Sequence, residues 1–239
     1  SRRSRGAPVR SPSKEPASRS VDSAAYAARQ GFQSEADAAF YARERFAGAR
    51  RSRSEHELGR LLRAVGGLGP VMTVLDVACG AGRILRAFEE KTPGLEMVGV
   101  DISLKMVSEA AGALDGKAWL AVAEAERLPF SDGAFEAVTC IRLLHHVPSA
   151  QVRRRILAEL ARVSRRGVVI TYFRRGSIQS LRRRIKSWRG RPVRSRQSIS
   201  RRELEADANA AGLRVERSRG IAPFISEQWI VTLVPKPGC

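Results

Sequence analysis

Apolar runs alternate with amphipathic segments along most of this 239-residue chain, and this alternation restricts the fold more than any other feature of the sequence. Short apolar runs predict buried strands at residues 71–77, 96–100, 118–123, 135–141, 167–173, 213–221 and 228–234. Helical patterns between several of these runs occupy residues 82–91, 104–114 and 149–164. Such alternation favours a parallel sheet with helices on both faces, and the last two runs favour an antiparallel pair. The sequence therefore predicts an α/β fold with a doubly wound, seven-strand, Rossmann-like sheet whose last strand pair is antiparallel.

Flanking segments of different composition surround this core. Residues 1–20 consist mainly of Arg, Ser and Pro, so they have too little apolar surface to bury, and we expect a disordered basic tail. Acid-poor N-termini of this kind also occur as organellar transit peptides, although this one lacks an apolar face. Residues 21–66 are rich in Ala with spaced aromatic and Leu side chains, which predicts an N-terminal helical cap. The predicted main domain spans residues 67–235 and contains a basic insertion at residues 174–199.

Basic residues are concentrated in two segments. The chain has 43 Lys and Arg against 24 Asp and Glu, a net charge of +19. Residues 1–20 contribute +5 and residues 174–202 contribute +12, which leaves about +2 for the other 190 residues. Local basicity of this kind indicates a nucleic acid, an anionic membrane surface or an acidic substrate as partner; the alternative is a solvated basic surface.

The basic insertion also carries an apolar stripe. Residues spaced three, four and three apart form it: Ile178, Leu181, Ile185 and Trp188. We therefore expect residues 177–189 to form a basic amphipathic lid helix that faces an apolar or membrane-borne acceptor, because such helices lie on anionic surfaces. Simple packing of the stripe on the domain is the alternative.

The most informative local motif is a glycine-rich turn between a strand and a helix. Apolar residues 74–77 run directly into Gly80-Ala81-Gly82. Glycines let the backbone approach a ligand closely and leave the N–H groups of the following helix pointing at it. Leu85 stands where the NAD fingerprint needs a small residue, and no Gly-Lys-Ser/Thr sequence follows, so neither that fingerprint nor a P-loop fits. An ordinary tight turn explains the same residues equally well.

An acidic residue ends the next strand. Asp101 follows residues 96–100 and lies nineteen positions after Gly82. A carboxylate at the tip of such a strand can accept both ribose hydroxyls of a nucleoside. Alternatively, Asp101 only begins the turn before Ser103 caps the next helix.

In five segments the sequence resembles the class I S-adenosylmethionine (SAM)-dependent methyltransferases: VLDVACGAG, VGVD, AEAERLPF, FEAV and LLHHVP. It looks most like the type-11 methyltransferase domain group, which includes ubiquinone/menaquinone-biosynthesis C-methyltransferases. The resemblance covers about residues 70–173 and is specific for the cofactor, SAM, but not for the acceptor. It implies that SAM lies across the C-terminal strand ends, at the switch point of the sheet.

The resemblance also implies which residues bind the cofactor. It places five residues at the methionine end of SAM: Asp76, Ala78, Gly80, Gly82 and Arg142. It places Asp101 at the ribose hydroxyls, Ile102 against the adenine, Glu124 at the adenine amino group and the Ala125 N–H at the ring. Two residues depart from the family pattern, because Ala78 stands where Gly is frequent and Glu124 where Asp is usual.

Methyl transfer from a sulfonium needs a general base only when the acceptor must lose a proton. His145 and His146 follow the fourth predicted strand and are the candidates for that base; a role in starting a helix or lining the pocket is the alternative.

The three Cys and three His have no ligand spacing, so we expect no bound metal. Three widely spaced Cys also argue against a disulfide framework and fit a reducing, cytoplasmic location.

We therefore expect an enzyme that transfers a methyl group from SAM to a small-molecule or lipid-like acceptor, with peripheral contact to an anionic membrane. The alternatives are an RNA methyltransferase that uses the basic segments and a non-catalytic scaffold with the same fold. The intact turn and Asp101 count against the scaffold. No apolar run reaches the length of roughly 18–20 residues that a membrane-spanning helix needs.

Overall fold

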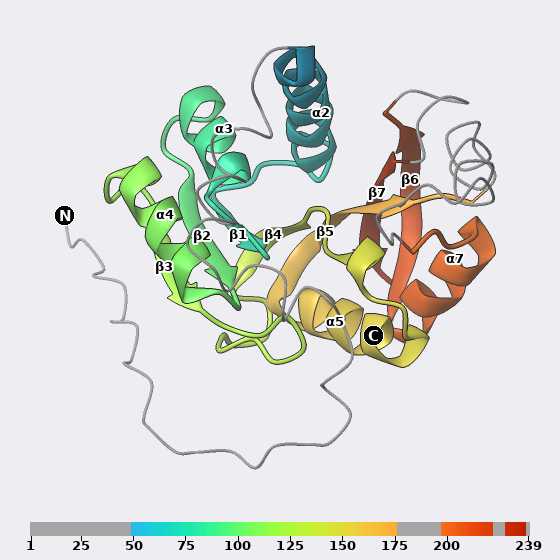
Figure 1. Ribbon diagram of the computed structural model, residues 1–239. Helices are drawn as coiled ribbons and strands as arrows, with labels where there is room; N and C mark the ends of the chain where they lie inside the picture. Colours follow the sequence, from blue (N-terminus) through green and yellow to red (C-terminus); the bar gives the residue numbers. More distant parts are fainter. Residues whose placement is uncertain (1–48, 176–196, 222–227, 238–239) are drawn as a thin grey trace.

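Figure 1 shows the computed structural model, which describes residues 49–175, 197–221 and 228–237. Three expectations lie outside these residues: the tail at residues 1–20, the lid helix at residues 177–189 and the first part of the cap. The rest of the predicted cap is the helix α2 (Ala49–Gly66).

The described strands form one seven-stranded sheet in the order β3-β2-β1-β4-β5-β7-β6. These strands are β1 (Thr73–Val77), β2 (Glu96–Asp101), β3 (Trp119–Val122), β4 (Phe135–Cys140), β5 (Ser164–Phe173), β6 (Leu213–Gly220) and β7 (Gln228–Pro235). The first five pair in parallel, whereas β7 runs antiparallel to both β5 and β6. The predicted seven-strand sheet with an antiparallel last pair is therefore confirmed. Because the strand order reverses between β1 and β4, their C-terminal ends form the switch point at which such sheets bind ligands.

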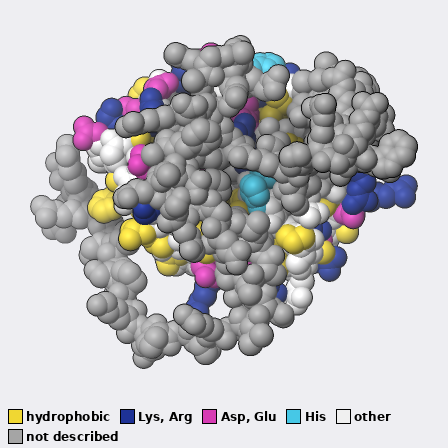
Figure 2. All heavy atoms as spheres, viewed as in Figure 1, with side chains coloured by type: hydrophobic (Ala, Val, Ile, Leu, Met, Phe, Trp, Pro, Cys, Tyr) yellow, Lys and Arg dark blue, Asp and Glu magenta, His cyan; other side chains and the backbone are white. Residues whose placement is uncertain are grey.

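Helices cover both faces of the sheet (Figure 1). One face carries α2, α3 (Arg83–Lys91) and α4 (Leu104–Leu114), and the other carries α5 (Ala150–Val163) and α7 (Arg201–Ala210). A short 3-10 helix, η3 (Leu144–His146), follows β4. In the space-filling view, basic side chains gather at the right-hand edge, over α7 (Figure 2).

Successive strand residues pack into different cores because side chains alternate across a sheet. Val74 belongs to the core beneath α2, α3 and α4, whereas its neighbour Leu75 belongs to the core beneath α5 and α7. Both residues are fully buried. Burial on both faces explains why these strands read as continuous apolar runs.

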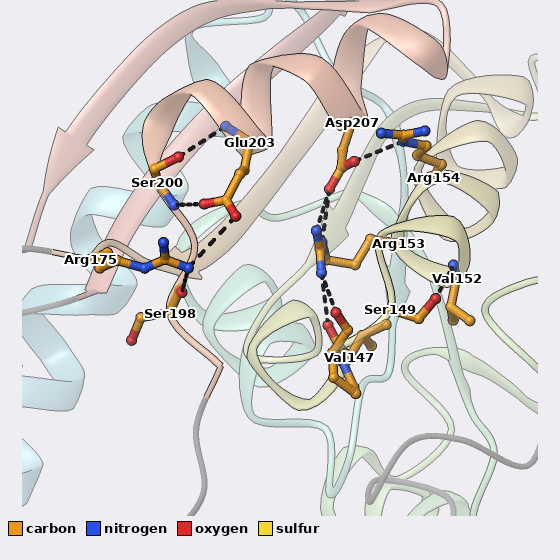
Figure 3. Close-up of polar contacts among 11 residues, drawn as sticks. Val147, Ser149, Val152, Arg153, Arg154, Arg175, Ser198, Ser200, Glu203 and Asp207 are labelled. Carbon is orange, nitrogen blue, oxygen red and sulfur yellow. Dashed lines mark hydrogen bonds and ion pairs between the residues drawn. The ribbon is translucent and has the colours of Figure 1, made fainter.

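A buried ion pair joins α5 to α7 (Figure 3). The Arg153 Nε donates to Asp207 Oδ2 at 2.8 Å, and Arg154 Nε donates to Asp207 Oδ1 at 2.9 Å. Arg153 Nη1 also donates to the carbonyl oxygens of Val147 and Pro148, at 3.2 and 2.8 Å. This network fixes the segment that follows η3 against the two helices.

Candidate active site

The turn after β1 has a backbone conformation that favours glycine at three positions. Ala78, Gly80 and Gly82 have φ values of 60°, 56° and 76°. A Cβ on Gly82 would lie 3.0 Å from Leu114 Cδ1, so the close packing of α4 also favours glycine there. A Cβ on Gly80 would meet nothing within 4 Å. The turn therefore presents bare backbone to open space at Gly80.

Ala78 is strained by its positive φ. For a residue with a Cβ, this left-handed conformation costs roughly 1–2 kcal/mol. A glycine, which the resemblance implies is frequent at this position, would adopt the same φ without that strain.

Asp101 holds the glycine turn in place. Its Oδ2 accepts a hydrogen bond from Gly80 N and its Oδ1 accepts one from Ser103 N, each at 2.9 Å. Burial raises the pKa of the Asp101 carboxyl, and these two N–H groups oppose that shift. Ser103 caps α4, as the simpler interpretation of Asp101 predicted. The role of Asp101 toward a ribose stays a prediction.

Asp76 lies on β1, beneath the turn, and is 1% exposed. Its Oδ1 accepts a 2.6 Å hydrogen bond from Thr139 Oγ1 on β4, whereas its Oδ2 is buried and has no hydrogen-bond partner among the described residues. Burial raises the pKa of Asp76 to about 7. The site therefore contains a buried carboxylate oxygen that can still accept a donor or a cation.

Arg142 is held by a carboxylate that the sequence analysis did not single out. Glu57, on α2, is 1% exposed and accepts hydrogen bonds from Arg142 Nε (3.2 Å) and Arg142 Nη2. It also accepts from Gln228 on β7 and lies 3.4 Å from Arg83 Nη2. Arg142 itself has a φ of 65°, and its N–H donates to Thr171 Oγ1 at 2.8 Å.

A sequence signal for Glu57 does exist. It lies four residues before Leu61, which is buried, and therefore on the apolar stripe of α2. A lone carboxylate on such a stripe must be paired when it is buried. The partners, however, come from distant parts of the chain.

A cavity of about 560 Å³ opens between α2, the glycine turn and the end of β4. Its lining includes Ala78, Gly80 and Arg142, three of the five residues that the resemblance placed at the methionine end. Ser54 and Leu58 contribute from α2. The predicted adenosine-end residues are not part of this lining: Asp101, Ile102, Glu124 and Ala125.

The two histidines after β4 have the contacts of packed side chains. His145 is 3% exposed and its ring lies edge-on to Phe173, with the ring centroids 4.5 Å apart. The His146 ring is 4.0 Å away, and Gln197 N donates to the His145 carbonyl oxygen at 2.9 Å. Neither histidine lines the cavity at the turn. Both residues lie in η3, which agrees with the alternative of a role in starting a helix, and a general-base role stays a prediction.

Among the residues that the structure describes, no group of three or more His, Cys, Asp or Glu could hold a metal ion. Cys79 and Cys140 are both buried and unpaired, and burial raises the pKa of each thiol. No described helix has the length and apolar character needed to cross a membrane.

Comparison with known proteins agrees with this geometry. Residues 74–167 match a family described as "Methyltransferase domain". The chain is 39% identical over 94 residues to a demethylmenaquinone methyltransferase of Thermotoga maritima, a match that covers 39% of each protein. It is 38% identical over 96 residues to a ubiquinone/menaquinone biosynthesis C-methyltransferase of Desulfotalea psychrophila, covering 39% of this chain and 37% of that protein. The match therefore spans about two fifths of the length of these relatives.

Among solved structures, a magnesium protoporphyrin IX methyltransferase from Synechocystis, with bound SAH, superimposes with a TM-score of 0.69. The identity is 17%, and the match covers 87% of this chain and 98% of that one. Fold and site define an α/β domain with a glycine turn at its switch point. More particularly, residues 74–167 match the methyltransferase domain family, and this part of the chain is similar to SAM-dependent methyltransferases.

Proposed function

We propose that this chain binds SAM at the glycine turn and transfers its methyl group to a small-molecule or lipid-like acceptor. One observation carries the proposal: the turn formed by Ala78, Gly80 and Gly82, all with positive φ, leaves bare backbone open at Gly80, next to a cavity of about 560 Å³. Backbone N–H groups and open space at that position suit a ligand that must approach closely.

The charged groups around the turn suit the two ends of an amino acid. The buried Oδ2 of Asp76, which has no hydrogen-bond partner among the described residues, can accept from an ammonium group. Arg142, fixed by Glu57, supplies a cation suited to a carboxylate. We assign these groups, with Ala78 and Gly80, to the methionine end of SAM.

Residues beyond the second and third strands would hold the adenosine. A carboxylate has about four lone-pair sites, so Asp101, which accepts backbone N–H groups that include those of Gly80 and Ser103, can still accept a ribose hydroxyl. Ile102 would lie against the adenine, with Glu124 and the Ala125 N–H at its edge. The chain would thus bind the cofactor from both sides of the switch point.

When bound, SAM supplies a methyl group on a positively charged sulfur, which is a good leaving group. The residues of the chain then need only to orient the two partners and exclude water. In this proposal α2, held over the turn by the Glu57–Arg142 pair, excludes water from that side. His145 and His146 remain candidates for a base if the acceptor must lose a proton.

The names of the relatives favour a quinone-type ring as acceptor. We place the reaction in the cytoplasm or at the membrane surface as part of the same proposal. An RNA acceptor is the second candidate, because the net charge of +19 favours a polyanion. A non-catalytic scaffold is the third, and the retained open turn argues against it.

Calorimetric titration with SAM tests the cofactor assignment. Asp101→Ala removes charge-assisted hydrogen bonds of about 1.5–3 kcal/mol each, so the affinity should fall at least about tenfold. Since Asp101 also holds the turn, Asp101→Asn serves as a second variant that keeps one acceptor oxygen, and Asp115→Ala, at the exposed end of α4, is the matched control. Wild-type affinity in a folded Asp101→Ala variant would refute the assignment.

Mass spectrometry of a cell extract incubated with the protein and isotopically labelled SAM identifies the acceptor class. Label in a small or lipid-soluble product is expected. Label found only in RNA would establish the second candidate, and SAM binding without any labelled product would establish the scaffold.

A further inference from the structure

An arginine-lined groove runs between α2 and the β6–β7 pair, apart from the cavity at the glycine turn. It consists of two adjoining cavities, of about 380 and 400 Å³, which share Ala64, Arg217 and Thr232 in their linings. Seven arginines line the two cavities together: Arg60, Arg63, Arg165, Arg166, Arg214, Arg217 and Arg219. Of the described residues, Glu216 is the sole acidic one in either lining. We call this feature the arginine groove.

A β-bulge turns the arginines of β6 toward this groove. Arg214 pairs with Val234, but the register then shifts, so that Arg217 pairs with Thr232 and Arg219 with Ile230. In a regular strand, positions 214 and 217 would point to opposite faces, because side chains alternate. The extra residue at the bulge places all three arginines on the α2 face. Bulges that redirect side chains in this way are common beside functional sites.

Most of the arginines in the groove form no ion pair with another described residue. Arg214 pairs with Glu216, and Arg166 lies 3.5 Å from Glu136. The other five arginines have no ion pair with a described carboxylate: Arg60, Arg63, Arg165, Arg217 and Arg219. The C-terminal end of α2 supplies only about half a negative charge. Within the part of the chain that the structure describes, five cations along one groove thus lack an anion.

Arg60 gives the groove a preformed donor. Its Nη1 donates to the Gly220 carbonyl oxygen at 2.6 Å, which fixes the guanidinium across from the end of β6. Its Nε is buried and has no hydrogen-bond partner in the described structure. A buried donor without a partner is unfavourable unless a ligand or water accepts from it.

We propose that the arginine groove binds the sugar–phosphate backbone of a nucleic acid, and this proposal does not depend on the methyltransferase activity. Alternate residues of a strand lie roughly 6–7 Å apart, so Arg217 and Arg219 present cations in a row that suits successive phosphates. Guanidinium groups bind phosphates with two parallel hydrogen bonds. Among the described residues, neither lining contains an aromatic side chain on which a base could stack, so recognition would involve the backbone and not the sequence.

The shape and surroundings of the groove favour this partner over a membrane. A concave groove between a helix and a strand pair admits a rod-like polyanion, whereas a bilayer surface is flat. The described surface exposes four large apolar side chains, and three of them lie elsewhere: Leu104 begins α4, and Trp119 and Val122 lie on β3, at the opposite edge of the sheet from β6. The fourth, Met72, is a single side chain near the groove, since its N–H donates to Glu136, the carboxylate beside Arg166. A membrane-inserting surface needs such side chains beside the cations.

Fluorescence anisotropy with the full chain tests the proposal, using an RNA duplex and a DNA duplex of the same sequence without SAM. Binding should weaken steeply between about 50 and 200 mM salt, because bound cations are released. Arg217→Ala/Arg219→Ala should weaken binding at least about tenfold and lower the slope of log K against log salt by about 2. Both side chains are exposed, so the variant should fold.

The matched control is Arg201→Ala/Arg202→Ala, which removes the same charge from exposed positions on α7, on the other face of the sheet. It should change the affinity and the salt slope much less. Equal losses in the two double variants, unchanged binding in the groove variant, or no binding to either duplex would overturn the proposal. So would binding to phosphatidylglycerol vesicles that the groove variant loses while duplex binding stays unchanged. Because SAM is absent throughout, failure here leaves the proposed cofactor site untouched.

Discussion

Removal of the Asp207 carboxylate should be among the most destabilising single substitutions in this chain. The side chains of Asp207 and Arg153 are 2% and 6% exposed, and they form a 2.8 Å ion pair between α7 and α5. Asp207→Ala leaves the Arg153 guanidinium buried, with the Val147 and Pro148 carbonyl oxygens as its remaining acceptors among the described residues. The substitution therefore creates an uncompensated buried charge.

The expected loss of unfolding free energy is about 3–5 kcal/mol, the usual cost of breaking a buried pair from one side. For a chain of this size, such a loss should lower Tm by roughly 6–20 °C. Urea unfolding followed by circular dichroism measures the free energy, and a thermal scan measures Tm.

Arg154→Ala is the matched control, because Arg154 binds the other Asp207 oxygen but is 50% exposed. Its loss should cost no more than about 1 kcal/mol. The double variant Arg153→Leu/Asp207→Leu should recover much of the stability, since it removes both charges. If Asp207→Ala were no more destabilising than Arg154→Ala, the argument from burial would be wrong.

Two further predictions concern the site itself. Ala78→Gly should raise the free energy of unfolding by about 0.5–1 kcal/mol, because glycine adopts the φ of 60° without strain; equal urea midpoints for the two proteins would contradict this. Burial raises the pKa of Asp76 to about 7, whereas the unfolded chain has the ordinary value of about 3.9. Between these two pH values the native state therefore binds more protons than the unfolded state. Its contribution should therefore make the chain less stable as the pH rises from about 4 to about 7, and Asp76→Asn should remove that part of the pH dependence in urea titrations. An identical pH profile for Asp76→Asn would show that Asp76 does not titrate in this range.

Local patterns in the sequence predicted the elements that form the fold. The seven strands and the helices α3, α4 and α5 lie where the apolar periodicities placed them, because a side-chain period is a local property of the chain. The largest boundary difference is at β5, which begins at Ser164, three residues before the predicted start at residue 167, since α5 passes into it with no intervening loop. The glycine turn could also be predicted from the sequence, because the ability of glycine to adopt a positive φ is a property of the single residue.

The arrangement of charges, by contrast, was decided by the tertiary structure. Glu57 binds Arg142, 85 residues away, and Gln228, 171 residues away, and nothing local to any of them indicates these contacts. The three arginines of β6 share one face only because a bulge shifts the register against β7. The period of the apolar side chains indicates which face of a helix or strand is buried, since that period is set by residues close together in the sequence. Which charge meets which carboxylate depends on the pairing of distant elements, and that pairing exists only once the sheet has formed.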